Sequence, residues 1–250
     1  MTGTVYLVGS GPGDPELLTV KARRLLEAAD VVLHDRLPGP ELLAEIPERK
    51  RVDVGKRVGG ERTPQAAING ALVAHAREGK TVVRLKGGDP MVFGRGGEEA
   101  AHLAEHGVPF EVVPGVTSAV AAPGVAGIPV THRGTASCVS VVTGHEDPEK
   151  PESDVDWAAL AETGGTIVVL MGVRRLPEYT AALCEAGLDG DTPVAVVERA
   201  TWPAQQVATG TLATVADEAE RVGVSPPAVT VVGDVAAQRE QVLAFLEGEP

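Results

Sequence analysis

Three short runs in the first half of the chain carry residues that could do chemistry, and each follows an apolar stretch. Glycine and proline crowd residues 9–14, Asp35 follows a second apolar stretch, and residues 86–90 read Lys-Gly-Gly-Asp-Pro. In open α/β sheets, ligands bind beyond the carboxyl ends of the strands, where the chain turns and exposes backbone donors. The three runs therefore predict a small-molecule site built from several strand ends.

The carboxylates in these runs suggest particular roles. Asp35, placed at the end of a strand, could orient a ligand or accept a proton, although a plain surface pair with Arg36 is an equally good interpretation. After the next run, Gly87 and Gly88 would let a ligand touch the backbone, and Asp89 would offer hydrogen-bond acceptors. Two such turns at neighbouring strand ends favour a binding site over two unrelated turns.

The run at residues 9–14 is a poor dinucleotide-binding fingerprint. Its sixth position, where that fingerprint requires glycine or alanine at the start of a helix, is Asp14 followed by Pro15. A tight turn that only reverses the chain stays an open interpretation of this run. A nicotinamide-dependent oxidoreductase is correspondingly disfavoured.

Positive charge is concentrated in residues 49–62. This segment holds six cations and two acids in a chain whose net charge is −13. Arginine and lysine bind carboxylates well, so the segment predicts an anionic ligand, and the pair Gly59 and Gly60 would let it fold over a substrate. The alternative is a solvated loop. The overall acidity argues against nucleic acid as a partner, because binding it needs clustered positive charge.

Histidine and cysteine indicate no metal site. His102 and His106 lie one helical turn apart, but this spacing more often marks a solvated helix face than a ligand pair. Cys138 and Cys184 stand alone and are expected to be buried, with neither a disulfide framework nor a zinc knuckle. No apolar run is long enough to span a membrane and the first residues do not resemble a secretory signal, so we expect a cytoplasmic protein.

Alternating strand and helix patterns position these residues. The predicted strands of the first half cover 4–8, 31–33, 52–54, 81–85 and 112–113. The predicted helices cover 16–29, a stretch opened by Thr63 as N-cap with Pro64 in its first position, 97–106, and a stretch capped by Thr117. Such β-α-β alternation predicts an α/β fold.

The pattern changes between residues 124 and 137, where glycine and proline punctuate the chain. We expect an N-terminal α/β domain over 1–123, an interdomain crossover over 124–137 and a C-terminal α/β domain over 138–250. The second domain is predicted to have strands at 139–142, 166–170, 194–197, 205–209 and 228–232. Its predicted helices cover 175–186, 212–222 and 235–246, and the acidic segment 146–154 is predicted to be an exposed loop.

The same motifs, taken together, resemble the tetrapyrrole methylases, and within them the enzymes that act on uroporphyrinogen III. The resemblance extends over essentially the whole chain. The matching segments are 8–14, 35–37, 54–57, 84–99, 113–118, 127–133, 142–145, 171–172 and 227–233.

The resemblance implies a fold, an activity and a partner. It implies two α/β domains with the active site in the cleft between them, and a homodimer. The implied activity is C-methylation of uroporphyrinogen III at its second and seventh ring carbons, through precorrin-1 to precorrin-2, for sirohaem or cobalamin synthesis. S-adenosylmethionine would donate the methyl group, and no metal would be needed. Another precorrin methyltransferase, a superfamily member that modifies RNA or protein, and a non-catalytic S-adenosylmethionine sensor remain alternatives.

The resemblance also assigns residues. Asp35 and Lys56 fall on the positions of a proton acceptor and a proton donor. Positions that contact S-adenosylmethionine are matched by Pro12, Gly87, Gly88, Asp89, Val92, Thr117, Ser118, Met171, Ala200 and Ala228. For the substrate carboxylates we expect contacts from Arg36, Arg57, Arg62 and Arg95.

Overall fold

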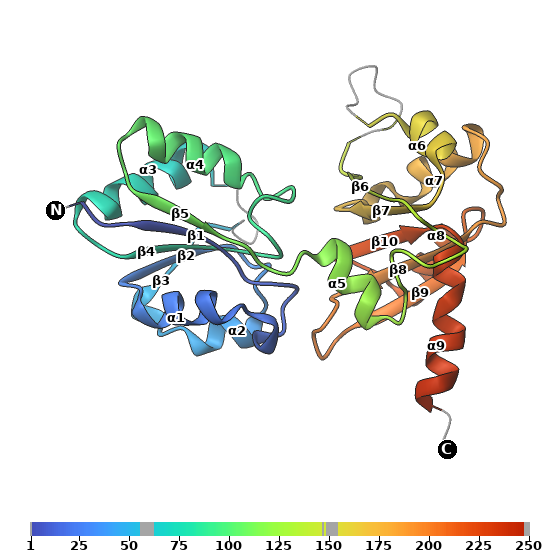
Figure 1. The fold of residues 1–250 in the computed structure, drawn as a ribbon, viewed down its shortest axis with the longest axis horizontal. Coiled ribbons are helices and arrows are strands. Elements are labelled where there is room, and N and C mark those ends of the chain that lie inside the picture. The colour runs from blue at the N-terminus through green and yellow to red at the C-terminus, as the bar shows by residue number, and fades with distance from the viewer. Residues whose placement is uncertain (1, 56–62, 147, 149–154, 248–250) are drawn as a thin grey trace. The chain divides into compact units, whose positions relative to one another are not determined.

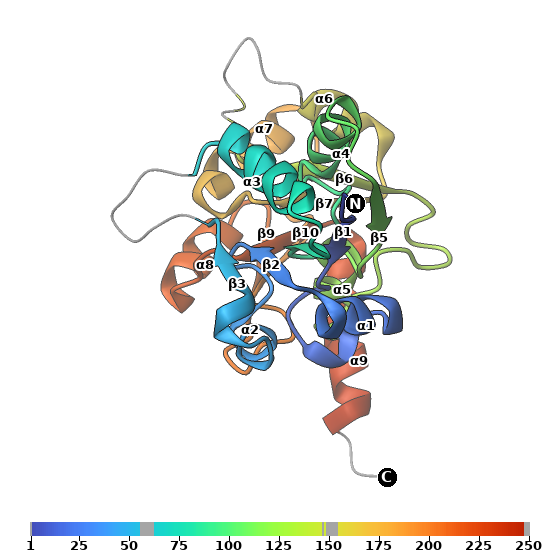
Figure 2. The same cartoon turned by 90° about the vertical axis from the view of Figure 1, so that its left-hand side faces the viewer.

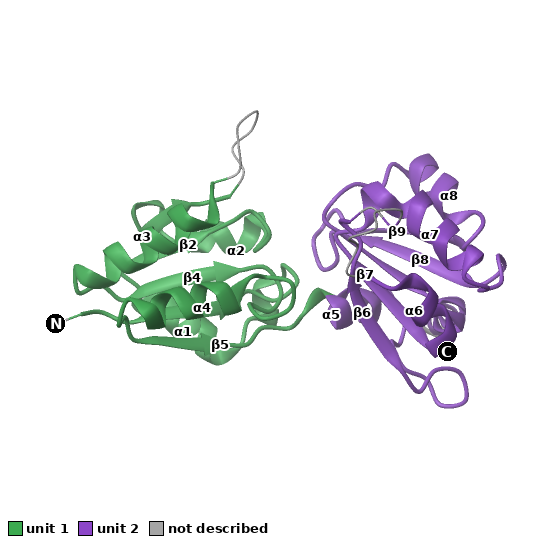
Figure 3. Cartoon of the chain, turned by 90° about the horizontal axis from the view of Figure 1, so that it is seen from above, with its two compact units in different colours: residues 1–118 green, residues 119–250 purple. Residues whose placement is uncertain are grey.

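The protein forms two compact units in a computed structural model that describes residues 2–55, 63–146, 148 and 155–247 (Figure 1). Unit 1 covers residues 1–118 and unit 2 covers residues 119–250 (Figure 3). The predicted crossover, residues 124–137, lies within unit 2 of this division, and its role as a separate linker stays a prediction. Both units have an α/β architecture, as the sequence predicts.

Unit 1 is built on a parallel five-stranded sheet with the order β3-β2-β4-β1-β5. Its strands are β1 (Val5–Gly9), β2 (Val31–His34), β3 (Arg51–Asp53), β4 (Val82–Lys86) and β5 (Phe110–Val113). The helices of this unit are α1 (Val20–Ala28), α2 (Pro40–Glu45), α3 (Gln65–Arg77) and α4 (Gly96–Glu105). The inner strands are buried on both faces, which is why they read as nearly continuous apolar runs.

Helices cover both faces of this sheet. Leu26 of α1 and Leu42 of α2 pack on one face, whereas Leu72 of α3 and Leu103 of α4 pack on the other. Figure 2 shows these two helical layers, with α3 and α4 above the sheet and α1 and α2 below it. The site residues at the strand ends are therefore carried by a sheet that is fixed from both sides.

Unit 2 contains a mixed five-stranded sheet with the order β6-β7-β10-β8-β9. Only β6 and β7 pair in parallel, and the other three pairings are antiparallel. Its strands are β6 (Val139–Thr143), β7 (Thr166–Leu170), β8 (Pro193–Glu198), β9 (Gln206–Thr211) and β10 (Ala228–Val232). The chain enters the unit through α5 (Ser118–Val125), and its other helices are α6 (Trp157–Thr163), α7 (Leu176–Glu185), α8 (Val215–Val222) and α9 (Gln238–Glu247).

Several predicted helix boundaries were wrong, because helix caps interrupt the periodic pattern. The predicted helix 16–29 is split, since Asp14 accepts a hydrogen bond from the Glu16 nitrogen (2.8 Å) and starts a 3-10 turn, and Thr19 then caps α1. Similarly, α3 begins after Pro64, which itself occupies the N-cap position, so Thr63 is not the cap.

The sequence analysis missed two short helices and misjudged one cysteine. Helices α2 and α6 have six and seven residues, too few to show a clear period, although Asp156 caps α6 by accepting from the Ala159 nitrogen (2.9 Å). Cys138 is exposed rather than buried, and Cys184 is half-buried. Most of the predicted acidic loop lies outside the described residues. Within the described ranges, no helix has the length and apolarity that crossing a bilayer requires.

Candidate functional site at the strand ends of unit 1

The carboxyl ends of β1, β2 and β4 meet at one edge of the sheet, because β4 lies between the other two. The register pairs Gly9 with Lys86 and His34 with Leu85. The residues that follow these strands therefore begin at the same level beyond the sheet. This edge joins the three motifs that the sequence analysis singled out.

The glycine-rich loops after β1 and β4 are hydrogen-bonded to each other. Gly11 and Gly88 exchange two backbone hydrogen bonds (3.2 and 2.7 Å), and the Ser10 nitrogen donates to the Lys86 oxygen (2.8 Å). The run at residues 9–14 is therefore part of a two-loop structure and more than a simple chain reversal.

Close backbone contacts explain why glycine is needed here. A Cβ atom on Gly9 would lie 2.5 Å from the Gly88 oxygen and 2.5 Å from the Gly115 nitrogen. A Cβ atom on Gly87 would lie 2.4 Å from the Cβ of Leu37. No side chain fits at these positions. At Gly9 the end of β1 packs against the backbones of the loops after β4 and β5, and at Gly87 the loop after β4 packs against Leu37 from the loop after β2.

Asp89 holds two of these loops together. Its Oδ1 accepts from the Met91 nitrogen (2.8 Å) and its Oδ2 accepts from the Gly115 nitrogen (3.1 Å). The Asp89 carboxylate therefore links the loop after β4 to the loop after β5. The sequence analysis had instead assigned its oxygens to a ligand, as hydrogen-bond acceptors. Near this link, a Cβ on Gly88 would lie 3.5 Å from the Ser118 nitrogen. The structure brings together Gly88, Asp89 and Ser118, three of the predicted cofactor contacts.

The remaining predicted cofactor contacts of unit 1 lie in the same loops. Pro12 follows the bonded Gly11, the Val92 nitrogen donates to the Asp89 oxygen (3.3 Å), and Thr117 precedes Ser118. Their contact with a cofactor stays a prediction.

Exposed apolar side chains accompany this backbone surface. They follow the carboxyl ends of β2, β4 and β5, and they are Leu37, Met91, Phe93 and Val116, each more than a third exposed. A flat organic ligand could pack on such side chains while its polar atoms bind backbone groups. The edge therefore has the composition expected of a small-molecule site.

Asp35 is turned toward the sheet and not toward its neighbour Arg36. Its Oδ2 lies 3.5 Å from Nη2 of Arg84, and its Oδ1 accepts from the Leu37 nitrogen (2.9 Å). Arg36 is instead near Asp53, with 3.7 Å between Nε and Oδ2. A surface pair of Asp35 with Arg36 is thus not formed, and the partly exposed Asp35 remains available to a ligand.

A buried group of charges lies behind Asp35, and the sequence analysis missed it. Oε1 of the fully buried Glu99 accepts from Nε of Arg84 (3.1 Å), Nζ of Lys86 (3.0 Å) and Nε2 of Gln65 (3.1 Å). Burial lowers the pKa of Lys86, and the nearby Arg84 lowers it further, while Glu99 partly offsets both effects. The signal was present in the sequence: two cations at alternate positions of an apolar strand share one face and need a buried anion.

Of the four arginines predicted to bind the substrate, Arg36 and Arg95 are among the described residues. Arg95 lies at the start of α4, is exposed, and makes a two-pronged ion pair with Glu98 (2.8 and 2.6 Å) that lowers the pKa of Glu98. Lys56, Arg57 and Arg62 lie outside the described residues, as does half of the positively charged segment.

The predicted cofactor contacts of unit 2 lie at one edge of its own sheet. The register pairs Leu170 with Val229 and Glu198 with Ala228, so Met171, Ala200 and Ala228 all lie near the same strand ends. Buried Glu198 accepts from the backbone nitrogen (2.9 Å) and hydroxyl (2.9 Å) of Ser225. This carboxylate therefore ties the end of β8, which precedes Ala200, to the loop that leads into Ala228.

Backbone strain is concentrated in these same loops. Among the described residues, the non-glycine residues with positive φ are Phe93, Arg95, Met171, Arg199 and Thr201. The first two follow β4, Met171 follows β7, and the last two flank Ala200. Such conformations are costly and are often found at functional sites, which supports the location of the predicted site residues.

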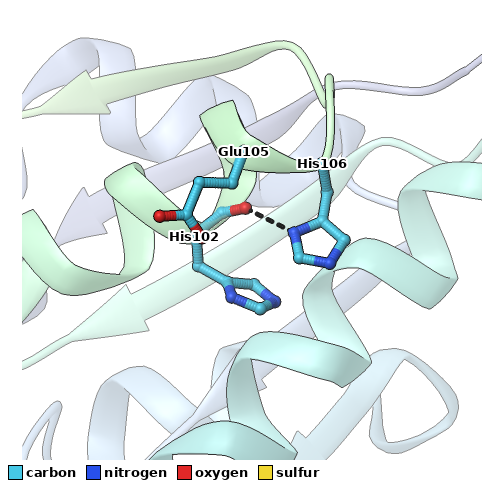
Figure 4. A group of neighbouring side chains, drawn as sticks. All are labelled: His102, Glu105 and His106. Carbon is cyan, nitrogen blue, oxygen red and sulfur yellow. Dashed lines mark hydrogen bonds between the residues drawn. The ribbon is translucent and has the colours of Figure 1, made fainter.

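A possible ligand set for a cation lies on the last turn of α4. Figure 4 shows His102, Glu105 and His106, whose potential ligand atoms all lie within 4.8 Å of one another. Nδ1 of His106 is 2.9 Å from the His102 carbonyl oxygen, so Nε2 is the ring nitrogen of His106 that could bind a cation. Glu105 and His106 are exposed, and this group lies at the opposite end of α4 from the strand ends, as a solvated helix face would.

The sequence matches a known family over most of its length. Residues 4–216 match the model of the family described as Tetrapyrrole (Corrin/Porphyrin) Methylases. A Methanosarcina barkeri protein, S-adenosyl-L-methionine-dependent uroporphyrinogen III methyltransferase, is 58% identical over 93% of this chain and 92% of its own length. The similarity thus extends over both units.

Solved structures give the same result for the fold. The uroporphyrin-III C-methyl transferase of Thermus thermophilus, complexed with S-adenyl homocysteine, has a TM-score of 0.80 and 46% identity, covering 94% of this chain and 99% of its own. A cobalamin biosynthetic enzyme, cobalt precorrin-4 methyltransferase, has a TM-score of 0.83 and 31% identity, covering 93% and 95%. Sequence and structure comparisons therefore agree on one group of relatives.

Proposed function

This chain belongs to the tetrapyrrole methylase family, and on that premise we propose that it is a methyltransferase that moves methyl groups from S-adenosylmethionine to ring carbons of uroporphyrinogen III. The observation that carries the proposal is the 58% identity to a uroporphyrinogen III methyltransferase over nearly the full length of both chains. Two methylations, at the second and seventh ring carbons, would convert the substrate through precorrin-1 to precorrin-2, a precursor for sirohaem or cobalamin.

The strand-end loops of unit 1 fit the proposed cofactor. Gly9, Gly88 and Gly115 pack backbone against backbone, Gly87 and Gly115 stay partly exposed, and apolar side chains such as Leu37 and Met91 are exposed on the same loops. Backbone groups could bind the polar atoms of S-adenosylmethionine there, and the apolar side chains could pack on its adenine. We propose that Pro12, Gly87, Gly88, Asp89, Val92, Thr117 and Ser118 contact this cofactor, together with Met171, Ala200 and Ala228.

The proposed chemistry asks little of the protein beyond orientation and proton transfer. When bound, S-adenosylmethionine supplies an electrophilic methyl group for in-line displacement by an electron-rich pyrrole carbon. Asp35 would stabilise the cationic ring and accept the proton that the ring must lose, and Lys56 would serve as proton donor. Asp35 is suited to this role because one of its oxygens faces Arg84 while the side chain keeps partial exposure.

The carboxylates of uroporphyrinogen III, eight in all, explain the local positive charge. Residues 49–62 carry a net charge of +4 in a chain of −13. We propose that Arg36, Arg57, Arg62 and Arg95 bind these carboxylates, since guanidinium groups form two parallel hydrogen bonds with them. The chain's net negative charge weighs against nucleic acid as a substrate.

A second candidate function is methylation of a different precorrin. Its support is the TM-score of 0.83 to cobalt precorrin-4 methyltransferase, which slightly exceeds the 0.80 to the uroporphyrin-III enzyme. The lower identity, 31% against 46%, favours uroporphyrinogen III. The homodimer, the cytoplasmic location and a reaction that needs no metal remain predictions.

A substrate-exchange assay tests the proposed function. The purified protein is incubated without oxygen with methyl-labelled S-adenosylmethionine and one of two acceptors in parallel reactions. The acceptors are uroporphyrinogen III and a precorrin that already carries methyl groups on both its second and its seventh ring carbon. We expect label in the tetrapyrrole only with uroporphyrinogen III. Label that enters only the methylated precorrin would favour the second candidate.

A further inference from the structure

The buried charges behind Asp35 form a chain of alternating sign. From the site inward they are Asp35, Arg84, Glu99 and Lys86, contributed by the end of β2, by β4 and by α4. The side chains of Arg84 and Lys86 are 5% exposed and that of Glu99 is fully buried. Burying charges is costly unless they are paired, so this arrangement requires an explanation.

Glu99 is the anion that makes two neighbouring cations tolerable. Arg84 and Lys86 lie two residues apart on one face of β4, and Oε1 of Glu99 accepts hydrogen bonds from both. The neutral amide of Gln65 donates a further hydrogen bond to the same oxygen (3.1 Å). Without Glu99, two like charges would face each other in the interior with no anion between them, and Asp35 would remain only on the far side of Arg84.

The guanidinium of Arg84 is held on several sides. Its Nε donates to Glu99, and its Nη1 donates to the carbonyl oxygens of Leu85 (3.0 Å) and Leu33 (3.5 Å). Its Nη2 is thereby directed at Oδ2 of Asp35, 3.5 Å away. The position of Asp35 is thus set partly by a group that solvent scarcely reaches.

We propose that Arg84 and Glu99 are positioning residues for the reaction: Glu99 fixes and neutralises Arg84, and Arg84 holds the carboxylate of Asp35 in the orientation that proton transfer needs. The inference rests on the proposed function, because it requires that Asp35 accepts a proton. Neither residue touches the substrate in this account. Their effect passes through Asp35 alone, which distinguishes it from general support of the fold.

The kinetic test is a double-mutant cycle. Glu99→Gln should lower kcat roughly tenfold to a hundredfold, because small displacements of a reacting group cost that much, and should leave the KM for S-adenosylmethionine unchanged. In an Asp35→Asn background the same substitution should have no further effect on kcat. Glu105→Gln, the same change on an exposed residue of the same helix, is the matched control and should leave kcat unchanged.

A conservative series covers the case in which Glu99→Gln does not fold. Arg84→Lys keeps a buried positive charge but cannot reach Glu99 and Asp35 together, so kcat should fall while the KM for S-adenosylmethionine is retained. Glu99→Asp keeps the anion and should recover part of the activity lost in Glu99→Gln. Equal losses from Glu99→Gln in both backgrounds, or a change confined to KM, would overturn the inference.

A second measurement does not depend on turnover. Since Glu99 partly offsets the lowering of the Lys86 pKa, Glu99→Gln should lower the pKa of Lys86 further, as followed by carbon NMR of its labelled side chain. An unchanged titration would show that Glu99 does not control the charges of this group and would overturn the inference. A fully active Asp35→Asn would instead overturn the proton-acceptor role and leave the titration result standing.

Discussion

The backbones of Gly9 and Gly115 are in contact: a Cβ atom added to Gly9 would lie 2.5 Å from the Gly115 nitrogen. Gly9 ends β1 and Gly115 follows β5, so the contact joins two neighbouring strand ends at the candidate site. The atoms that would be struck are backbone atoms, which cannot move aside as a flexible side chain can. The loops at this edge are therefore tied to one another at their closest points.

Gly9→Ala should consequently destabilise unit 1 and weaken cofactor binding. We expect a loss of about 1–3 kcal/mol, which is typical of overpacking, and a lower affinity for S-adenosylhomocysteine. Scanning and titration calorimetry measure the two effects. Gly70→Ala is the control: this exposed position in α3 has nothing within 4 Å, so alanine should stabilise the helix slightly. Normal binding and stability in Gly9→Ala would show that the loops can separate without consequence.

Asp35→Asn should reduce kcat by about 10²- to 10⁴-fold, the range typical of a lost general base, with nearly normal affinity for S-adenosylmethionine. The amide keeps the shape of the side chain but cannot take up a proton. Asp191→Asn, at an exposed position of unit 2, is the matched control. Full turnover by Asp35→Asn would leave Asp35 with a structural role only.

The sequence predicted the architecture where local patterns are strong. The inner strands β1, β2 and β4 are apolar because they are buried on both faces, and glycine or a carboxylate marks their ends. The boundaries of α1 were missed because Asp14 and Thr19 each start a separate helical turn within one periodic run.

Contacts between distant residues were the part that could not be predicted. Adjacent Asp35 and Arg36 suggest a pair, but neighbouring side chains near a strand point in opposite directions, so Asp35 meets Arg84 from another strand. In the sequence, Glu99 likewise looks like an ordinary acidic residue in the first turn of a helix. Only the packing of α4 on the sheet shows that it is the buried partner of two cations.

The buried Glu198 should make the stability of unit 2 depend on pH. Burial alone would raise its pKa, but hydrogen bonds from Ser225 and Gln206 and the charge of Arg199 lower it below the ordinary value of 4.5. With a lowered folded-state pKa, the carboxylate stabilises the fold above pH 4.5, and this contribution is lost as the pH falls through the folded-state value.

Glu198→Gln should therefore be less stable than the parent protein by about 1–3 kcal/mol at pH 7, and the difference should shrink below pH 4.5. Both tryptophans, Trp157 and Trp202, lie in unit 2, so their fluorescence during urea unfolding reports on this unit. Glu218→Gln removes an exposed ion pair with Arg221 and should change little at either pH. A difference that stays constant with pH would contradict the assigned charge state.

Turnover should be independent of metal ions. We expect that dialysis against EDTA leaves kcat unchanged and that the double variant His102→Ala and His106→Ala is fully active, because the half-buried His102 and the exposed His106 lie away from the strand ends. Parallel assays before and after dialysis measure this. Activity that EDTA removes and Zn²⁺ restores only in the protein with both histidines would assign a working metal site to α4.

The central claim is tested most directly by the product itself. The purified protein is incubated without oxygen with uroporphyrinogen III and ¹³C-methyl S-adenosylmethionine, and the oxidised tetrapyrrole is analysed by mass spectrometry and carbon NMR. The account predicts a product with two labelled methyl groups, on the second and seventh ring carbons. Cofactor binding with no labelled tetrapyrrole, or label at other ring positions, would contradict it.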